Sequence, residues 1–178
     1  MKTYRFAYGS GTVEFPLEEK NIIGELHGNV VEPISDIRRE LWASLDAPID
    51  SAPLCRRVTP GSTVALVVSD MSRFWMRQDL VVPHLVDYLT QRCGVRERDI
   101  TIVIANGTHT GGDEAELRTL VTDAVYDRIT VENHDCESED LVYLGTTPHG
   151  TPVSINRTAA LADMVICLGA ATHHVMAG

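Results

Sequence analysis

The stretch Val64-Ala65-Leu66-Val67-Val68-Ser69-Asp70-Met71-Ser72-Arg73 is an uninterrupted apolar run that ends in a polar cluster. The same arrangement recurs at residues 100–111 and at residues 164–178. Short apolar runs bounded by turn residues are typical of strands that are buried on both faces. Helical patterns lie between these runs, so we expect an α/β protein with a mainly parallel, Rossmann-like sheet and helices on both of its faces.

Further elements are expected before and between these strands. Residues 4–8 and 12–15 flank the turn Gly9-Ser10-Gly11, which predicts an N-terminal β-hairpin. The other expected elements are a helix that opens at 32–35 with Ser35 as its cap, helices at 81–93, 113–124 and 157–162, and strands at 128–132, 141–144 and 151–155.

The composition is that of an ordinary globular domain, and it argues against several partners. The 178 residues are 44% hydrophobic and 22% charged, with a formal net charge of −10. Such an acidic chain is not expected to bind nucleic acid, because that affinity comes mainly from Lys and Arg. No apolar stretch is long enough for a membrane span, and residues 1–6 lack the apolar core of a signal peptide. A cytoplasmic location is therefore expected.

The cysteines show no metal-binding pattern. Cys55, Cys93, Cys136 and Cys167 are widely spaced, and no two of them form a CxxC motif, so a zinc site is not expected. Reduced thiols are expected to accompany a cytoplasmic location. Cys167 lies within the third apolar run, which predicts an inert core residue.

Each polar cluster follows an expected strand, and the carboxyl ends of parallel strands meet along one edge of a sheet. Asp70 and Arg73 follow the first strand, His109 follows the second, and His173 and His174 follow the third. Histidine takes and returns a proton near neutral pH, and arginine binds a carboxylate with two parallel hydrogen bonds. An aspartate at such a place orients a histidine or accepts a ribose hydroxyl. The sequence therefore predicts a small-molecule site at this edge.

Plainer interpretations of each cluster remain open at this point. His109 could be a solvent-facing loop residue whose neighbouring glycines serve only the turn, and Asp70 and Arg73 could be a local ion pair. Only one of the adjacent histidines 173 and 174 can face a given site, because neighbours on an extended segment point to opposite sides. The chain has no GxxxxGK[ST] phosphate loop, no GxGxxG after the first long strand and no GxSxG elbow.

Taken in order and spacing, these pieces resemble the N-terminal domain of the nickel-pincer-dependent lactate racemase family. The matching segments are Tyr8-Gly9, Pro60-Gly61, Ser69-Asp70-Met71-Ser72-Arg73, Gly107-Thr108-His109, Val142-Tyr143-Leu144-Gly145-Thr146 and His174-Val175-Met176-Ala177-Gly178. The resemblance implies a two-domain racemase or epimerase of a 2-hydroxy acid, with its active site between the domains. It also implies a nickel-pincer nucleotide cofactor that takes a hydride from the hydroxyl-bearing carbon and returns it to the other face.

The same resemblance implies roles for individual residues. Inversion needs a base near each face of the substrate, and these bases are expected to be His109 and His174. Arg73 is expected to hold the substrate carboxylate, with Asp70 as its orienting neighbour. The expected cofactor-binding residues are Ser72, Gly107, Thr108, Thr110 and Gly111.

The resemblance has two departures. Phe74 and Trp75 stand where the family usually continues with proline, which suggests a hydroxy acid other than lactate or a different pocket. The family continues beyond the last motif to a cofactor-tethering lysine, a nickel-ligating histidine and a second domain. Residues 1–178 are therefore expected to be the N-terminal domain of a longer enzyme, truncated after Gly178, with no metal ligand of its own. Such a fragment should be inactive alone and expose apolar surface that promotes self-association.

Two other functions stay open on the residues alone. One is an α/β module that binds a nucleotide-like ligand without chemistry, and the other is a hydroxy acid dehydrogenase. The missing glycine fingerprint disfavours the dehydrogenase.

Overall fold

The computed structural model describes residues 1–172 and divides into two compact units, residues 1–33 and the part that begins at Ile34. The first unit confirms the expected hairpin, because β1 (Lys2–Tyr8) pairs antiparallel with β2 (Gly11–Leu17). Gly9 in the turn has a φ of 57°, a conformation that glycine adopts without strain. A short 3-10 helix, η1 (Glu19–Asn21), follows the hairpin.

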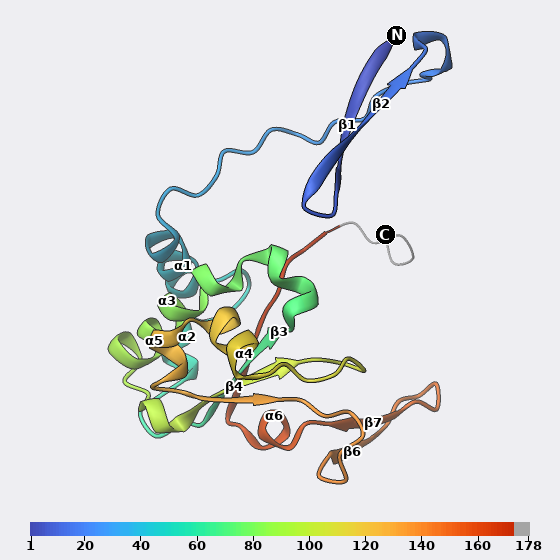
Figure 1. Cartoon of the computed structure of the whole chain (residues 1–178). Helices are drawn as coiled ribbons and strands as arrows, with labels where there is room; N and C mark the ends of the chain where they lie inside the picture. Colours follow the sequence, from blue (N-terminus) through green and yellow to red (C-terminus); the bar gives the residue numbers. More distant parts are fainter. Residues whose placement is uncertain (173–178) are drawn as a thin grey trace. The chain divides into compact units, whose positions relative to one another are not determined.

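The second unit is built on a parallel sheet, as the alternation of strands and helices predicts (Figure 1). Its four strands are β3 (Val64–Ser69), β4 (Ile100–Ala105), β5 (Thr130–Asn133) and β8 (Met164–Leu168). Their order across the sheet is β5-β4-β3-β8. The strands β6 (Val142–Thr146) and β7 (Pro152–Ile155) form a separate antiparallel pair.

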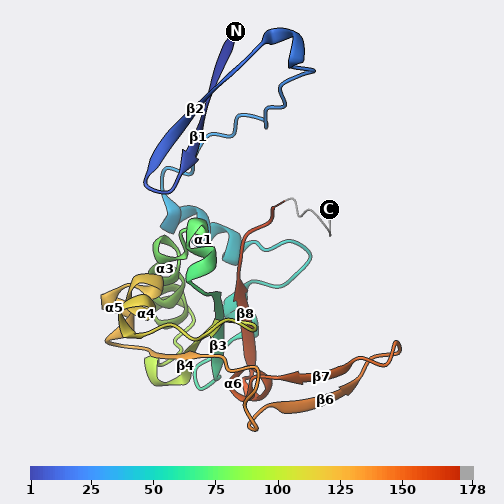
Figure 2. The ribbon, with the colours of Figure 1, turned by 45° about the vertical axis from the view of Figure 1, so that its right-hand side comes forward.

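Helices cover both faces of this sheet. Figures 1 and 2 show α3, α4 and α5 on one side and α6 on the other. The α-helices are α1 (Ile37–Asp46), α2 (Leu54–Arg57), α3 (Val82–Asp87), α4 (Glu114–Val121), α5 (Asp123–Tyr126) and α6 (Arg157–Leu161). The other helical turns are the 3-10 segments η2 (Met71–Met76), η3 (Gln78–Leu80) and η5 (Glu97–Asp99) and the π-helix η4 (Tyr88–Arg92). Among the described helices, none has both the length and the apolar character that crossing a membrane requires.

The core lies between the sheet and the helices α1, α3 and α4. Leu66 of β3 and Ile102 of β4 are fully buried, and each such side chain stabilises the fold by about 2 kcal/mol relative to an exposed one. Tyr88 is also fully buried, and its hydroxyl donates a hydrogen bond to Asp46 Oδ1 at 2.6 Å. Its ring meets that of Trp42 edge to face, at 5.6 Å between centroids, and this contact ties α1 to η4.

Two helix boundaries differ from the prediction. The expected cap Ser35 is wrong: Asp36 caps α1, because its Oδ1 accepts from the backbone N–H of Arg39 at 2.9 Å. The helix expected over residues 81–93 is α-helical only to Asp87 and continues as the π-helix η4. It ends where predicted, since Gly94 takes a φ of 73°.

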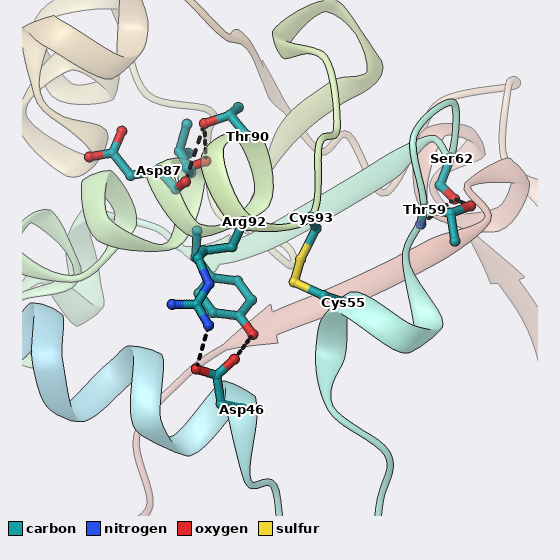
Figure 3. Close-up of a disulfide and its surroundings, with 10 residues drawn as sticks. Asp46, Cys55, Thr59, Ser62, Asp87, Thr90, Arg92 and Cys93 are labelled. Carbon is teal, nitrogen blue, oxygen red and sulfur yellow. Dashed lines mark hydrogen bonds and ion pairs between the residues drawn. A yellow bond between two sulfur atoms is a disulfide. The ribbon is translucent and has the colours of Figure 1, made fainter.

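Two cysteine expectations are wrong. Cys55 of α2 and Cys93, which follows η4, are joined by a disulfide instead of being free thiols (Figure 3). Their Cα atoms are 4.7 Å apart, and they are 38 residues apart in the sequence, so no local motif marks the pair. Cys167 is exposed and not in the core.

The exposure of Cys167 follows from the position of β8 at the end of the described sheet. Alternate side chains of this strand face opposite sides. Met164, Ile166 and Leu168 pack against the core, whereas Val165 and Cys167 face outward, with Val165 41% exposed.

Candidate active site at the sheet edge

The predicted site residues lie where β3 and β4 end. These strands are parallel neighbours in register, with Ser69 opposite Ala105, so Asp70 and Asn106 begin their loops side by side. Strand β8 runs parallel to β3 with Val68 opposite Leu168, and the chain therefore leaves all three strands at the same edge. This is the edge at which open α/β sheets bind ligands.

The central feature of the site is a hydrogen bond between Asp70 and His109. His109 Nδ1 lies 2.6 Å from Asp70 Oδ2, although the two residues are 39 positions apart in the sequence. The carboxylate side chain is only 14% exposed, whereas the imidazole is 54% exposed. The Asp70 carboxylate is therefore largely shielded from solvent, whereas a ligand can reach the His109 ring.

Hydrogen bonds keep Asp70 ionised. Burial alone raises the pKa of this carboxyl, but hydrogen bonds from Ser72 and His109 outweigh it and hold the pKa below its ordinary value. Ser72 Oγ donates to Asp70 Oδ1 at 2.6 Å. An ionised carboxylate only accepts hydrogen bonds, so the imidazole proton lies on Nδ1 and the lone pair of the neutral ring lies on Nε2.

Arg73 joins this group through Ser72. Its Nη1 donates to Ser72 Oγ at 3.1 Å, which places Ser72 between the guanidinium and the carboxylate of Asp70. Among residues 1–172, Arg73 forms no ion pair within 4 Å, so most of its donors stay available for a ligand anion. The structure thus places Asp70 directly against His109 and only indirectly against Arg73.

A hollow of about 400 Å³ opens beside His109. Its walls are the loop after β4 and the loop after β5, and it is lined by Thr108, His109, Thr110, Gly111, Asn133, His134, Asp135, Cys136 and Glu137. Three of the five expected cofactor-binding residues, Thr108, Thr110 and Gly111, belong to this lining. Gly107 lies outside it and forms the turn, where a φ of 59° favours glycine. Ser72 lies with Asp70 instead.

The remaining predicted base, His174, lies outside the described residues. Within residues 1–172, no three His, Cys, Asp or Glu side chains gather closely enough to hold a metal ion. The described part of the site therefore consists of an acid–base pair, a cation and hydrogen-bond donors.

Two site residues were not predicted from the sequence. Asn106 is 2% exposed, and its side chain donates to Asn133 and to the backbone carbonyl of His134, each at 3.1 Å. An asparagine directly after the apolar run of β4 could have been noticed, but nothing near Asn133 in the sequence indicates its partner.

Comparisons with known proteins show the family of this chain. Residues 8–178 match the family model described as the lactate racemase N-terminal domain. The chain is 24% identical over 181 residues to the lactate racemase of Thermoanaerobacterium thermosaccharolyticum, an alignment that covers 100% of this chain and 42% of the relative. It is also 24% identical over 174 residues to the lactate racemase of Lactiplantibacillus plantarum, covering 96% of this chain and 40% of the relative.

The fold is also found in a solved structure, the lactate racemase apoprotein from Thermoanaerobacterium thermosaccharolyticum. The TM-score is 0.78 at 23% identity, over 93% of this chain and 38% of that one. The chain spans about two fifths of the length of the relatives that it matches.

Proposed function

Because the chain belongs to the lactate racemase N-terminal domain family, we propose that it supplies the acid–base half of a racemase or epimerase for a 2-hydroxy acid. The relatives are more than twice as long, so we propose that a second domain completes the cleft and that residues 1–178 alone do not turn over substrate. The observation that carries this proposal is the Asp70–His109 pair beside an open hollow.

In this proposal His109 is a base. Its Nε2 would take the hydroxyl proton of one enantiomer as the hydride leaves the hydroxyl-bearing carbon, and in the reverse direction its imidazolium would give a proton to that oxygen. The ionised Asp70 then lies against the imidazolium and stabilises its positive charge. The second base, for the opposite face of the substrate, is proposed to be His174.

Arg73 is proposed to hold the substrate carboxylate. A 2-hydroxy acid is anionic at neutral pH, and a chain with a net charge of −10 needs a local cation to bind it. A guanidinium suits a carboxylate because two of its N–H groups bond both oxygens at once. Its link through Ser72 to Asp70 would hold the anchor and the base in one arrangement.

We propose that the hydrogen-bond donors of the hollow would hold the nucleotide part of a nickel-pincer cofactor. Hydroxyls of Thr108 and Thr110 and the backbone at Gly111 are donors of the kind that hold phosphate or ribose oxygens. When bound, this cofactor supplies the hydride acceptor and donor. The only lysines are Lys2 and Lys20, both in the first unit, so no lysine among the strand-end loops could tether it.

The test is racemisation by the full-length protein that contains this chain, loaded with the cofactor and given single enantiomers of lactate and of larger 2-hydroxy acids. Replacement of a general base should lower kcat by about 10²–10⁴-fold in the His109→Ala variant. His149→Ala is the matched control, because His149 is an exposed histidine in the turn between β6 and β7. Unchanged racemisation by His109→Ala would refute the proposal, and accumulation of the keto acid without inversion would indicate a dehydrogenase instead.

A further inference from the structure

The loop that carries His109 is fastened at both of its ends to one asparagine of the neighbouring strand. At the first end, the carbonyl of Asn106 accepts from the backbone N–H of His109 at 3.0 Å. The Asn106 side chain in turn donates to Asn133 Oδ1 at 3.1 Å. The backbone of the histidine is therefore fixed to a buried residue that Asn133 holds in place.

At the second end, Asn133 bonds Gly112 twice. Asn133 Oδ1 accepts from the backbone N–H of Gly112 at 3.1 Å, and Asn133 Nδ2 donates to the carbonyl of the same residue at 2.8 Å. This is the reciprocal pair that one strand residue makes with another across a sheet. Since the backbone N–H and C=O are fixed in role, the orientation of the Asn133 amide is determined.

The fit around Asn133 is tight, and the strand that carries it pairs with a buried strand. A Cβ at Gly111 would lie 2.9 Å from Asn133 Cγ, so a larger residue there would displace the amide. Asn133 is the last residue of β5 and lies opposite Ile104 of the buried strand β4. The amide of Asn133 therefore holds the His109 loop at a defined place relative to the sheet.

We infer that Asn133 is a positioning residue for His109, which sets where the imidazole lies relative to the substrate. This inference rests on the proposed function, in which His109 is the base. A base displaced by about 1 Å can lose about a hundredfold in rate, even when the residue that moved it is not in contact with the substrate. The side chain that holds the loop should therefore act on kcat more than on KM.

The test compares Asn133→Asp with Asn156→Ala in the full-length protein. Asn133→Asp keeps the shape and the acceptor but loses the donor to Gly112 and places a negative charge beside its carbonyl. Asn156 is the matched control: its Oδ1 caps α6 by accepting from Ala159 N at 3.0 Å, and its Nδ2 lies 3.4 Å from Glu132. Both variants lose a hydrogen bond of a half-buried amide, but only Asn133 is bonded to the His109 loop.

Three quantities are measured: the melting temperature, the kcat and KM of racemisation, and the NMR signal of the His109 Nδ1 proton in protein labelled at histidine. We expect Asn133→Asp to lower kcat by about a hundredfold with little change in KM, and to broaden or shift the Nδ1 proton signal, which reports the bond to Asp70. Asn156→Ala should lower the melting temperature while leaving kcat and the signal as in the native protein.

The NMR readout separates this inference from the proposed function. If the native protein has no racemase activity but Asn133→Asp still loses the Nδ1 signal, the positioning role stands and the function fails. If His109→Ala abolishes activity while Asn133→Asp keeps native kcat and a native signal, the inference is wrong and the function stands. Equal changes in the Asn133→Asp and Asn156→Ala variants would also overturn it, because they would show a general loss of stability.

Discussion

Reduction of the Cys55–Cys93 disulfide should destabilise the second unit by an amount that follows from the length of the loop it closes. The bond closes a loop with a sequence separation of 38 residues, and this loop contains the central strand β3 and the helix α3. The entropy that such a cross-link removes from the unfolded chain corresponds to about 4 kcal/mol at 25 °C. For a chain of this size, the loss should lower the melting temperature by about 10 °C.

The assay is thermal unfolding of the 178-residue chain with and without a phosphine reductant. Intact mass before each scan verifies the redox state, since the oxidised chain is lighter by two hydrogen atoms. Cys55→Ser should have the melting temperature of the reduced chain and should not respond further to reductant. Cys136→Ser removes an exposed free cysteine and should have the melting temperature of the oxidised chain. Equal melting temperatures for the verified oxidised and reduced chains would refute the loop-closure argument.

Three further outcomes follow from individual contacts. In the full-length enzyme, Asp70→Asn should lower kcat by about a hundredfold or more, because an amide can donate to His109 Nδ1 and move the ring proton to Nε2. Asp163→Asn, at the opposite edge of the sheet, should have native kcat. Burial and the hydrogen bond to Asp46 raise the pKa of Tyr88 to about 12, so between pH 10 and 12 the folded state keeps a proton that the unfolded state has lost. The free energy of unfolding should therefore fall by about 3 kcal/mol as the pH rises through this interval. Urea titrations of Tyr88→Phe should lack that decline. Thr122→Gly should raise the melting temperature by about 3 °C, because Thr122 has a φ of 76° and a ψ of 151°, which are strained for threonine; a lower melting temperature would contradict this.

The sequence was sufficient for the framework of the second unit. The apolar runs at β3, β4 and β8 predict parallel strands because they are short, uncharged and bounded by turn residues, although β8 is only half-buried in the structure. Parallel strands bring their carboxyl ends to one edge, so the neighbouring positions of Asp70 and His109 follow from topology alone.

The finer contacts could not be predicted, because they depend on distances between residues that are remote in sequence. Asp70 was expected beside Arg73, three residues away, but in the structure it bonds His109 directly. Asn133 of β5 bonds Gly112 in the loop after β4, and Cys55 pairs with Cys93 at a separation of 38 residues. No local sequence motif indicates either contact.

The edge position of β8 leads us to expect that copies of this chain can pair through this strand. In the described parallel sheet β8 and β5 are the two edge strands, and the β8 sequence Met164-Val165-Ile166-Cys167-Leu168 contains no charge and no proline to discourage pairing with another sheet edge. The force that keeps copies apart is instead the repulsion of their net charge of −10, which acts over about 10 Å in 0.1 M salt and over less as salt is added. We therefore expect added salt to promote association of copies through this strand edge, and light scattering at increasing ionic strength would measure it.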